Sequence, residues 1–261
     1  AVTSGKGGVG KTNVSVNLAV AMAGNGKQVM PLDGDLGLAN IDVMLGLQPS
    51  YNLAHVLEGK CRLEDTLMMG PNGVMIVPAS SGKRHMAELS QAEHAGLVRA
   101  FSELTRPVDV LIIDTAAGIA DSVITFSQAS QEVIVVVTGD PTSLTDAYAT
   151  IKVLIQDHGL DEIYLVPNGM HSQQEGQVLF ERINQVCARF LNHSIKYLGT
   201  IENDELILSA LKKYQSVLEF APGSSGARDF RRLAEATRQL EPVEEPSGGL
   251  EFFVERLVQR T

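Results

Sequence analysis

Gly5-Lys6-Gly7-Gly8-Val9-Gly10-Lys11-Thr12, close to the start of the chain, has the spacing of a phosphate-binding loop: a glycine, four residues, then Gly-Lys-Thr. Glycines carry no Cβ and tolerate positive φ, so their backbone N–H groups can wrap around triphosphate oxygens. In such loops the lysine reaches the β- and γ-phosphates and the threonine hydroxyl ligates Mg²⁺, which assigns these roles to Lys11 and Thr12. The sequence therefore predicts a nucleotide site here.

The residues around this loop supply the expected context. Residues 1–3 read as the end of a strand, and residues 13–23 carry apolar side chains near helical spacing. Strand, loop and helix in this order favour a phosphate site over a glycine-rich turn without a ligand, which is the alternative. The helix that starts near Thr12 would direct the positive end of its dipole at the site.

Composition indicates a globular chain of 261 residues, 44% of them hydrophobic, which is enough for a sizeable core. The net charge of −10 disfavours non-specific DNA binding, which depends on neutralising phosphates. The two cysteines, Cys61 and Cys187, are far apart and offer neither a disulfide framework nor a paired-cysteine metal site, so a reducing cytoplasm is expected. We find no apolar run long enough to span a membrane and no signal peptide, and we expect native residues to precede Ala1.

Strand-like and helix-like segments alternate along the chain. This alternation predicts a doubly wound α/β domain over residues 1–240, with a mostly parallel sheet of about seven or eight strands and helices on both faces. Runs such as 133–137 are apolar on both faces, as in central parallel strands. The predicted strands are 1–3, 28–33, 74–77, 108–114, 132–138, 162–168 and 196–201. The predicted helices are 13–23, 90–105, 121–129, 142–157, 173–191, 204–214 and 227–240.

Pro31 interrupts the second predicted strand. Proline has no N–H to donate to a ladder and is unusual in a central strand. The sequence therefore predicts either that the N–H side is unpaired at this position or that the strand register is irregular.

Carboxylates follow several predicted strands, at the end of a parallel sheet where ligands bind. Asp35 follows the second strand, and Asp114 ends the apolar run 110–113. A carboxylate accepts hydrogen bonds and binds hard cations, so both are candidates for Mg²⁺ and its water. Asp140-Pro141-Thr142-Ser143, after the fifth strand, is interpreted first as a turn and a helix cap.

Lys6 is a residue that an ordinary phosphate loop does not need. With it, the loop resembles the deviant Walker A motif of the MinD/ParA ATPases. In that family the extra lysine reaches the phosphates of the nucleotide in the partner subunit, so the resemblance implies ATP, Mg²⁺ and an ATP-dependent homodimer. The alternative for Lys6 is a solvated surface lysine.

The segment 33–40 resembles switch I of that family, where Asp35 matches the residue that positions the attacking water and helps to hold hydrated Mg²⁺. Asp33 is interpreted as structural. Asp114 with the segment 115–118 resembles Walker B and switch II. Asn168 matches an asparagine that reads the adenine edge. Asp204 resembles a second base contact, with a helix N-cap as the alternative.

The predicted site combines these residues. Catalytic roles fall to Lys6, Lys11 and Asp35, and Mg²⁺ contacts fall to Thr12, Asp35 and Asp114. The residues expected to contact ATP are Gly5, Gly7, Gly8, Val9, Gly10, Lys11, Thr12, Asn13, Asn168 and Asp204.

Segments 115–118, 172–176 and 250–258 resemble the flagellar-number regulators of this family, called FleN or FlhG. The resemblance implies a slow ATPase switch in the cytoplasm that acts as an antiactivator. Its partner would be a bacterial enhancer-binding transcription activator that drives flagellar genes.

Other classes remain as alternatives. A ParA-like DNA-partitioning ATPase would need a basic patch, and four arginines of one late helix offer a candidate, although such a run is more often a solvated face: Arg228, Arg231, Arg232 and Arg238. A metallocluster carrier would need paired cysteines, and a small-molecule kinase would need a substrate motif that we do not see. Direct DNA binding is not expected.

Residues 241–249 read as a linker rich in proline, glycine and acid, before a predicted amphipathic helix over 250–261. Its apolar face would consist of Leu250, Phe253, Val254, Leu257 and Val258. Docking on its own domain is favoured by the short linker. Peripheral contact with the inner membrane, as in a MinD-like positioning ATPase, is weakened because two acids offset two arginines on the polar face. Partner binding is the third possibility.

Overall fold

The computed structural model describes residues 1–80, 84–240 and 250–253. Its centre is a seven-stranded sheet in the order β2-β5-β1-β6-β7-β8, with β9 also paired to β7, and every pairing is parallel. The strands are β1 (Val2–Ser4), β2 (Val29–Gly34), β5 (Val110–Ala117), β6 (Val133–Val137), β7 (Ile163–Met170), β8 (Lys196–Tyr197) and β9 (Ile201–Glu202). The predicted fold class is confirmed.

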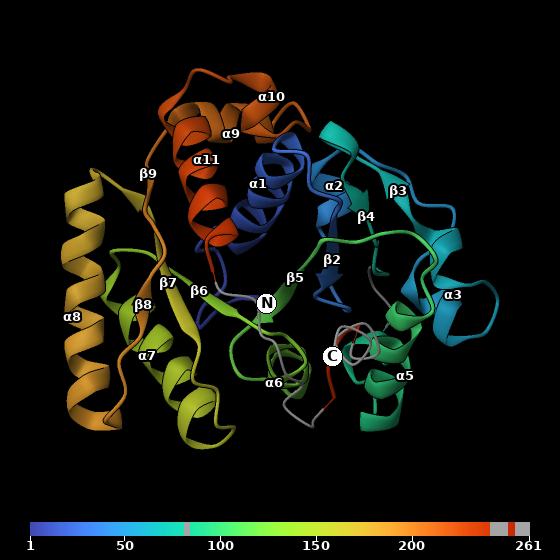
Figure 1. Ribbon diagram of the computed structural model, residues 1–261, viewed down its shortest axis with the longest axis horizontal. Coiled ribbons are helices and arrows are strands. Elements are labelled where there is room, and N and C mark those ends of the chain that lie inside the picture. Colours follow the sequence, from blue (N-terminus) through green and yellow to red (C-terminus); the bar gives the residue numbers. More distant parts are fainter. Residues whose placement is uncertain (81–83, 241–249, 254–261) are drawn as a thin grey trace.

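Helices cover both faces of this sheet because successive residues of each strand point to opposite sides. In β6, Ile134 and Val136 pack in the cluster formed with α1 (Lys11–Gly24) and α11 (Ser225–Arg238). Val133 and Val135 pack in another cluster, on the opposite face. The helices of that face are α5 (Gln91–Ser102), α6 (Asp121–Gln128), α7 (Pro141–Gln156) and α8 (Gln173–Leu191). Figure 1 shows α1 and α11 side by side.

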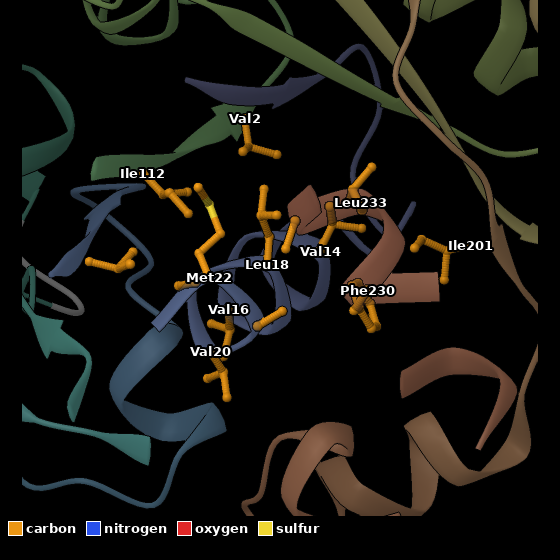
Figure 2. Close-up of a cluster of buried hydrophobic side chains, with 14 of the residues drawn as sticks. Val2, Val14, Val16, Leu18, Val20, Met22, Ile112, Ile201, Phe230 and Leu233 are labelled. Atoms are coloured by element: carbon orange, nitrogen blue, oxygen red, sulfur yellow. The ribbon is translucent and has the colours of Figure 1, made fainter. Parts of the chain in front are cut away.

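Helix α1 is buried along most of its length, which fixes the loop before it. Leu18 and Met22 lie between the sheet and the rest of the cluster, with Val2 of β1 and Ile112 of β5 above them (Figure 2). Such a helix cannot shift without disturbing a close-packed core. The phosphate loop therefore stands on a rigid strand and a rigid helix.

The predicted long elements are present, with different ends. The predicted strand 108–114 is observed as Val110–Ala117, and it continues three residues past Asp114 because its end still pairs with β1. The other main differences concern short elements. The predicted strand 74–77 is reduced to β4 (Met75–Ile76), which pairs antiparallel with β3 (Met68–Met69) in a separate two-stranded sheet. The predicted strand 196–201 is split into β8 and β9, which pair with successive parts of β7. Short elements were not predicted because four or five residues show no helical period: α2 (Ile41–Met44), α3 (Leu53–Leu57), α4 (Arg84–Ala87), α10 (Val217–Phe220), η1 (Leu63–Thr66) and η2 (Pro71–Gly73). Helix α9 spans Glu205–Leu211.

Pro31 lies on the outer side of an edge strand. β2 pairs with β5 in regular register from Val29 to Gly34. The Pro31 carbonyl points outward and accepts the N–H of Val77 at 2.9 Å, and Asp33 donates its N–H to the Val77 carbonyl at 3.2 Å. The missing N–H of Pro31 is on this outer side, so no bond to β5 is lost. Of the two expectations, the unpaired N–H side is the correct one.

Two residues near the end of the chain contact the domain: Phe252, outside the predicted apolar face, and Phe253, which belongs to that face and has its ring 6.2 Å from that of Phe101. Residues 250–253 form a turn, not the first turn of a helix. Phe252 is buried, with its ring 5.1 Å from that of Phe101 and 6.3 Å from that of Phe126, and its N–H donates to the Ala129 carbonyl at 3.1 Å. Leu250 is exposed. The linker 241–249 and three members of the predicted face lie outside the described residues: Val254, Leu257 and Val258.

Candidate nucleotide site

The phosphate loop connects β1 to α1 and has the backbone that its glycines permit. Gly8 and Gly10 have φ of 81° and 88°, a region that L side chains rarely adopt. A Cβ on Gly5 would overlap the backbone of Asp146 in α7, so this first glycine is needed for close packing. From Lys6 to Asn13, no backbone N–H donates to an acceptor among the described residues. These free N–H groups lie at the N-terminus of α1, an arrangement suited to an anion.

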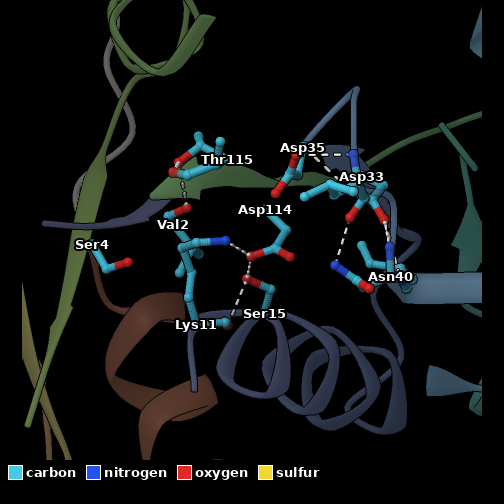
Figure 3. A network of polar contacts seen from close by, with 12 residues as sticks. Val2, Ser4, Lys11, Ser15, Asp33, Asp35, Asn40, Asp114 and Thr115 are labelled. Carbon is cyan, nitrogen blue, oxygen red and sulfur yellow. Dashed lines mark hydrogen bonds and ion pairs between the residues drawn. The ribbon is translucent and has the colours of Figure 1, made fainter. Parts of the chain in front are cut away.

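Lys11 and Asp114 form a buried pair beneath this loop (Figure 3). The Lys11 ammonium donates to Asp114 Oδ1 at 3.0 Å, and the Ser15 hydroxyl donates to the same oxygen at 3.0 Å. The side chains of Lys11 and Asp114 are only 10% and 2% exposed. Sequence reasoning missed Ser15, although its position one helical turn after Lys11 places it on the same side of α1. Thr12 and Asn13 follow in the first turn of α1.

Two aspartates at the end of β2 have different surroundings. Asp33 is 1% exposed and accepts the N–H groups of Asn40 at 2.7 Å and Ile41 at 2.9 Å. The pKa of the Asp33 carboxyl is raised to about 7, mainly by burial and also by the charges of Asp114 and Asp35, against the lowering effect of the two N–H bonds. Among the described residues, the Asp35 carboxylate accepts only the Leu38 N–H, at 3.2 Å, and Asp35 is more exposed than Asp33. Asp35 is therefore free to turn toward the loop, whereas Asp33 is held.

Lys6 does not contact its own loop. Its ammonium donates to the Thr142 hydroxyl at 2.6 Å and lies 3.5 Å from Asp140 Oδ2, with 41% of the lysine side chain exposed. The hydroxyl and N–H of Thr142 lower the pKa of the Asp140 carboxyl, and Lys6 adds to this effect. Asp140 is the N-cap of α7, whereas the sequence favoured Thr142 or Ser143 as the cap. The segment 140–143 therefore has a structural role, and it has a second contact, with Lys6, that the sequence did not reveal.

Asn168 and Asp204, the two residues expected to contact the adenine base, both form hydrogen bonds within the protein. Asn168 donates from Nδ2 to the Val9 carbonyl at 2.8 Å, which joins β7 to the phosphate loop and leaves Oδ1 to accept. Asp204 caps α9 and accepts the Gly226 N–H at 2.9 Å and the Ser225 hydroxyl at 3.0 Å. Burial alone would raise its pKa, but the N–H groups of Gly226 and Leu206 hold the pKa of Asp204 below its usual value. The N-cap alternative for Asp204 is the arrangement observed.

Outside the phosphate loop and its neighbours, the described residues show no second candidate active site. A cavity of about 500 Å³ lies at the other end of the strands, at the amino ends of β1, β5 and β6. Among the described residues, no group of three or more histidines, cysteines or acids could hold a metal ion. Cys61 and Cys187 are free thiols. No helix in the described part of the chain is long and apolar enough to cross a membrane.

The glycine loop between β1 and α1, with Lys11 bonded to Asp114 of β5, defines a P-loop nucleoside triphosphatase. A family model described as ParA, NUBPL iron-transfer P-loop NTPase, matches residues 1–238. The chain belongs to the ParA/MinD family of P-loop ATPases.

The relatives cover nearly the whole chain. Antiactivator FleN of Pseudomonas aeruginosa is 52% identical over 259 residues, which are 99% of this chain and 92% of that protein. Flagellum site-determining protein YlxH of Helicobacter pylori is 34% identical over 263 residues, with 99% and 89% covered. The structure of septum site-determining protein MinD of Pyrococcus horikoshii with Mg-ADP superposes with a TM-score of 0.75 at 28% identity, covering 91% of this chain and 94% of that one.

As a member of this family, the chain is an ATPase that uses ATP with Mg²⁺. The residues present fit these groups. The unbonded N–H groups from Lys6 to Asn13 suit phosphate oxygens, and the hydroxyl and carboxylate oxygens of Thr12, Asp35 and Asp114 suit a hard cation.

Proposed function

We propose that this chain is an ATP-dependent dimerisation switch that acts as an antiactivator of flagellar gene expression. The observation that carries the proposal is the 52% identity to antiactivator FleN over 99% of the chain. The partner would be an enhancer-binding transcription activator in the cytoplasm. The ATP-bound dimer would bind this activator, and hydrolysis would return the chain to the monomer.

The site residues have distinct parts in this cycle. Backbone N–H groups of the loop and Lys11 bind the phosphates, and Thr12 and Asp114 hold Mg²⁺, which neutralises charge on the transferred phosphoryl group. Asp35 orients the attacking water. Lys6 reaches across to the nucleotide of a second copy. Its present contacts to Thr142 and Asp140 are exposed, and exposed ion pairs contribute little, so Lys6 can leave them at small cost.

Sizing in solution tests the dimer. The protein should elute as a larger species with ATP and Mg²⁺ than with ADP or without nucleotide. Lys6→Ala should block this shift more than it weakens nucleotide binding, because the lysine acts on the partner's phosphates. Lys213→Ala, which changes an exposed lysine of the 212–216 segment, is the matched control. A monomer that is saturated with ATP at high protein concentration would contradict the proposal.

The antiactivator role is tested with purified components. The ATPase domain of an enhancer-binding activator of flagellar genes should be bound and inhibited by this chain with ATP, and released with ADP. Binding that is absent in every nucleotide state would overturn this part of the proposal and leave the ATPase switch intact.

Contacts of the arginines in α11 support the expectation of no direct DNA binding. Arg228 and Arg231 donate to the carbonyls of Gly223 and Pro222, both at 2.7 Å. Arg232 pairs with Asp229 at 3.2 Å, and Arg238 pairs with Glu235 at 2.7 Å. Each guanidinium already has a protein acceptor, so phosphate contacts would have to compete with it.

The buried ring of Phe252 supports docking of the tail on its own domain in preference to the membrane. Flotation with liposomes that contain anionic lipid, with and without ATP, distinguishes the two. We expect little flotation without nucleotide. Strong flotation with ATP that is lost in Phe253→Glu would show that the tail is a membrane switch instead.

A further inference from the structure

Asp33 anchors the predicted switch I segment, residues 33–40, to strand β2 of the sheet. Its carboxylate accepts three backbone N–H groups: Asp35 at 3.3 Å on Oδ1, and Asn40 at 2.7 Å and Ile41 at 2.9 Å on Oδ2 (Figure 3). One buried side chain therefore joins the start and the end of the loop 34–41. The Ile41 N–H is also the first of α2, so the same carboxylate fixes the beginning of that helix.

The strand behind Asp33 makes this anchor rigid. Asp33 and Asp114 are paired residues in the register of β2 and β5. A Cβ on Gly34 would meet Ile113 at 2.9 Å and the Asp114 carbonyl at 3.1 Å, so the backbone after Asp33 is pressed against β5. Asp33 thereby holds the start of switch I at a fixed distance from the strand that carries Asp114.

The tip of the same loop is exposed at Leu38. Leu38 is 68% exposed, and its N–H is shared between the Asp35 carboxylate at 3.2 Å and the Asp35 carbonyl at 3.1 Å. The Asn40 side chain donates to the Leu38 carbonyl at 2.5 Å, a bond within the loop. Both acceptors of the Leu38 N–H belong to Asp35, so the Asp35 carboxylate can change its partner while the Leu38 N–H keeps its bond to the Asp35 carbonyl.

We infer that Asp33 is a positioning residue for ATP hydrolysis, which sets the place of Asp35 relative to the phosphate loop. The inference rests on the proposed function, in which Asp35 orients the attacking water. Asp33 itself would touch neither nucleotide nor water. It acts through the three N–H groups of switch I, and its loss should affect the rate of the chemical step more than nucleotide binding.

Asp33→Asn tests this with little change in size. The introduced amide keeps one acceptor oxygen, but its NH₂ group replaces the other. This NH₂ group then faces either the Asp35 N–H or the N–H groups of Asn40 and Ile41, and it cannot accept from them, so one end of the loop is released. We expect kcat to fall by about 10- to 100-fold, as small misplacements of a reacting group do, with KM for ATP and ATP-dependent dimerisation within about twofold of wild type.

Asp109→Asn is the matched control. Asp109 also accepts a backbone N–H at an end of β2, that of Gln28 at 2.8 Å, but at the opposite end from the nucleotide site. The Asp109→Asn variant should hydrolyse ATP at the wild-type rate. A wild-type kcat in Asp33→Asn, or an equal fall of kcat in both variants, would overturn the inference, as would a loss of binding and dimerisation that matches the loss of turnover.

Amide hydrogen exchange of the unmodified protein gives a readout that does not depend on the variant folding. With ATP and Mg²⁺ bound, the Asn40 and Ile41 amides, which are bonded to the buried Asp33, should stay protected, whereas the amide of the exposed Leu38 should exchange faster. Equal exchange at all three positions would overturn the inference. Failure of the proposed function can be distinguished from failure of this inference. If the proposed function is wrong, the wild-type protein itself shows no ATP turnover and no ATP-dependent dimer.

Discussion

Asp35 and Asp33 are two residues apart, yet only Asp33 is held by bonds to the loop ends. Strand β2 ends at Gly34, so Asp33 lies within the strand and is buried, whereas Asp35 follows the strand and is less buried. The motif predicted Asp35 as the carboxylate that orients the attacking water. It gave Asp33 only a general structural role, because the N–H groups that Asp33 binds come from residues seven and eight positions later.

Asp35→Ala should retain ATP binding and ATP-dependent dimerisation but lose turnover. Water positioning and charge stabilisation supply most of the catalysis in phosphoryl transfer, so the loss should be large. Steady-state phosphate release, measured together with sizing in ATP, checks this. Hydrolysis at the wild-type rate would show that another group orients the water.

Asn168→Ala should weaken ATP binding. The variant loses the bond to the Val9 carbonyl that joins β7 to the phosphate loop, and with it the amide oxygen available to the base. A net contribution of about 1 kcal/mol per hydrogen bond predicts a rise in Kd of roughly fivefold or more. Calorimetric titration measures this. Asn184→Ala is the control, because Asn184 accepts the Ile195 N–H at the far end of α8. Equal affinity in both variants would remove Asn168 from the site.

At the scale of elements, the contact of the chain end with α5 and α6 joins the tail to the helix that follows switch II. Phe252 packs between Phe101 of α5 and Phe126 of α6, and α6 begins three residues after Gly118. The periodicity of the tail predicted a helix face without Phe252, because it considered the tail as an isolated amphipathic segment. The aromatic pocket that accepts Phe252 is assembled from two distant helices.

Phe252→Ala should release the tail while the domain stays folded. Burying a phenylalanine side chain contributes about 1.5–3 kcal/mol, and the tail is otherwise a terminal segment. Limited proteolysis should cut the variant faster after residue 240, with a small decrease in Tm. Leu250→Ala, at an exposed position of the same turn, should behave like wild type. Unchanged proteolysis of Phe252→Ala would show that the ring does not hold the tail.

At the scale of the whole molecule, the pH dependence of stability should contain a term from Glu132, at the amino end of β6. Burial and then the neighbouring Glu162 carboxylate raise the pKa of Glu132 to about 7 in the folded protein. Between the ordinary pKa of 4.5 and about 7, the folded state binds more protons at Glu132 than the unfolded state does, so the stability that Glu132 contributes falls as pH rises through that window.

Glu132→Gln removes this term. The difference in Tm between the variant and wild type should therefore rise as pH increases from about 4.5 to about 7, the range set by the two pKa values, and then level off. Thermal unfolding at a series of pH values measures it. A difference in Tm that does not depend on pH would show that Glu132 titrates normally.

The sequence by itself determined the features that depend on neighbouring residues. The phosphate loop, the apolar strands such as β6 and the long helices were predicted because turn chemistry and periodicity operate over a few residues. The sequence also indicated that Asp114 lies near the carboxyl end of a buried strand, where ligands bind, although β5 continues for three residues beyond it. These features were sufficient to predict the fold and the phosphate end of the site.

The tertiary structure decided what depends on contacts between distant segments. Pro31 is tolerated because strand pairing makes β2 an edge strand, and no local pattern gives strand order. Lys6 meets Thr142, Asn168 meets Val9, and Phe252 meets Phe101, across separations of 136, 159 and 151 residues. Such partners are chosen by the packing of whole helices and strands, because a side chain can bond only to what the folded core brings within reach.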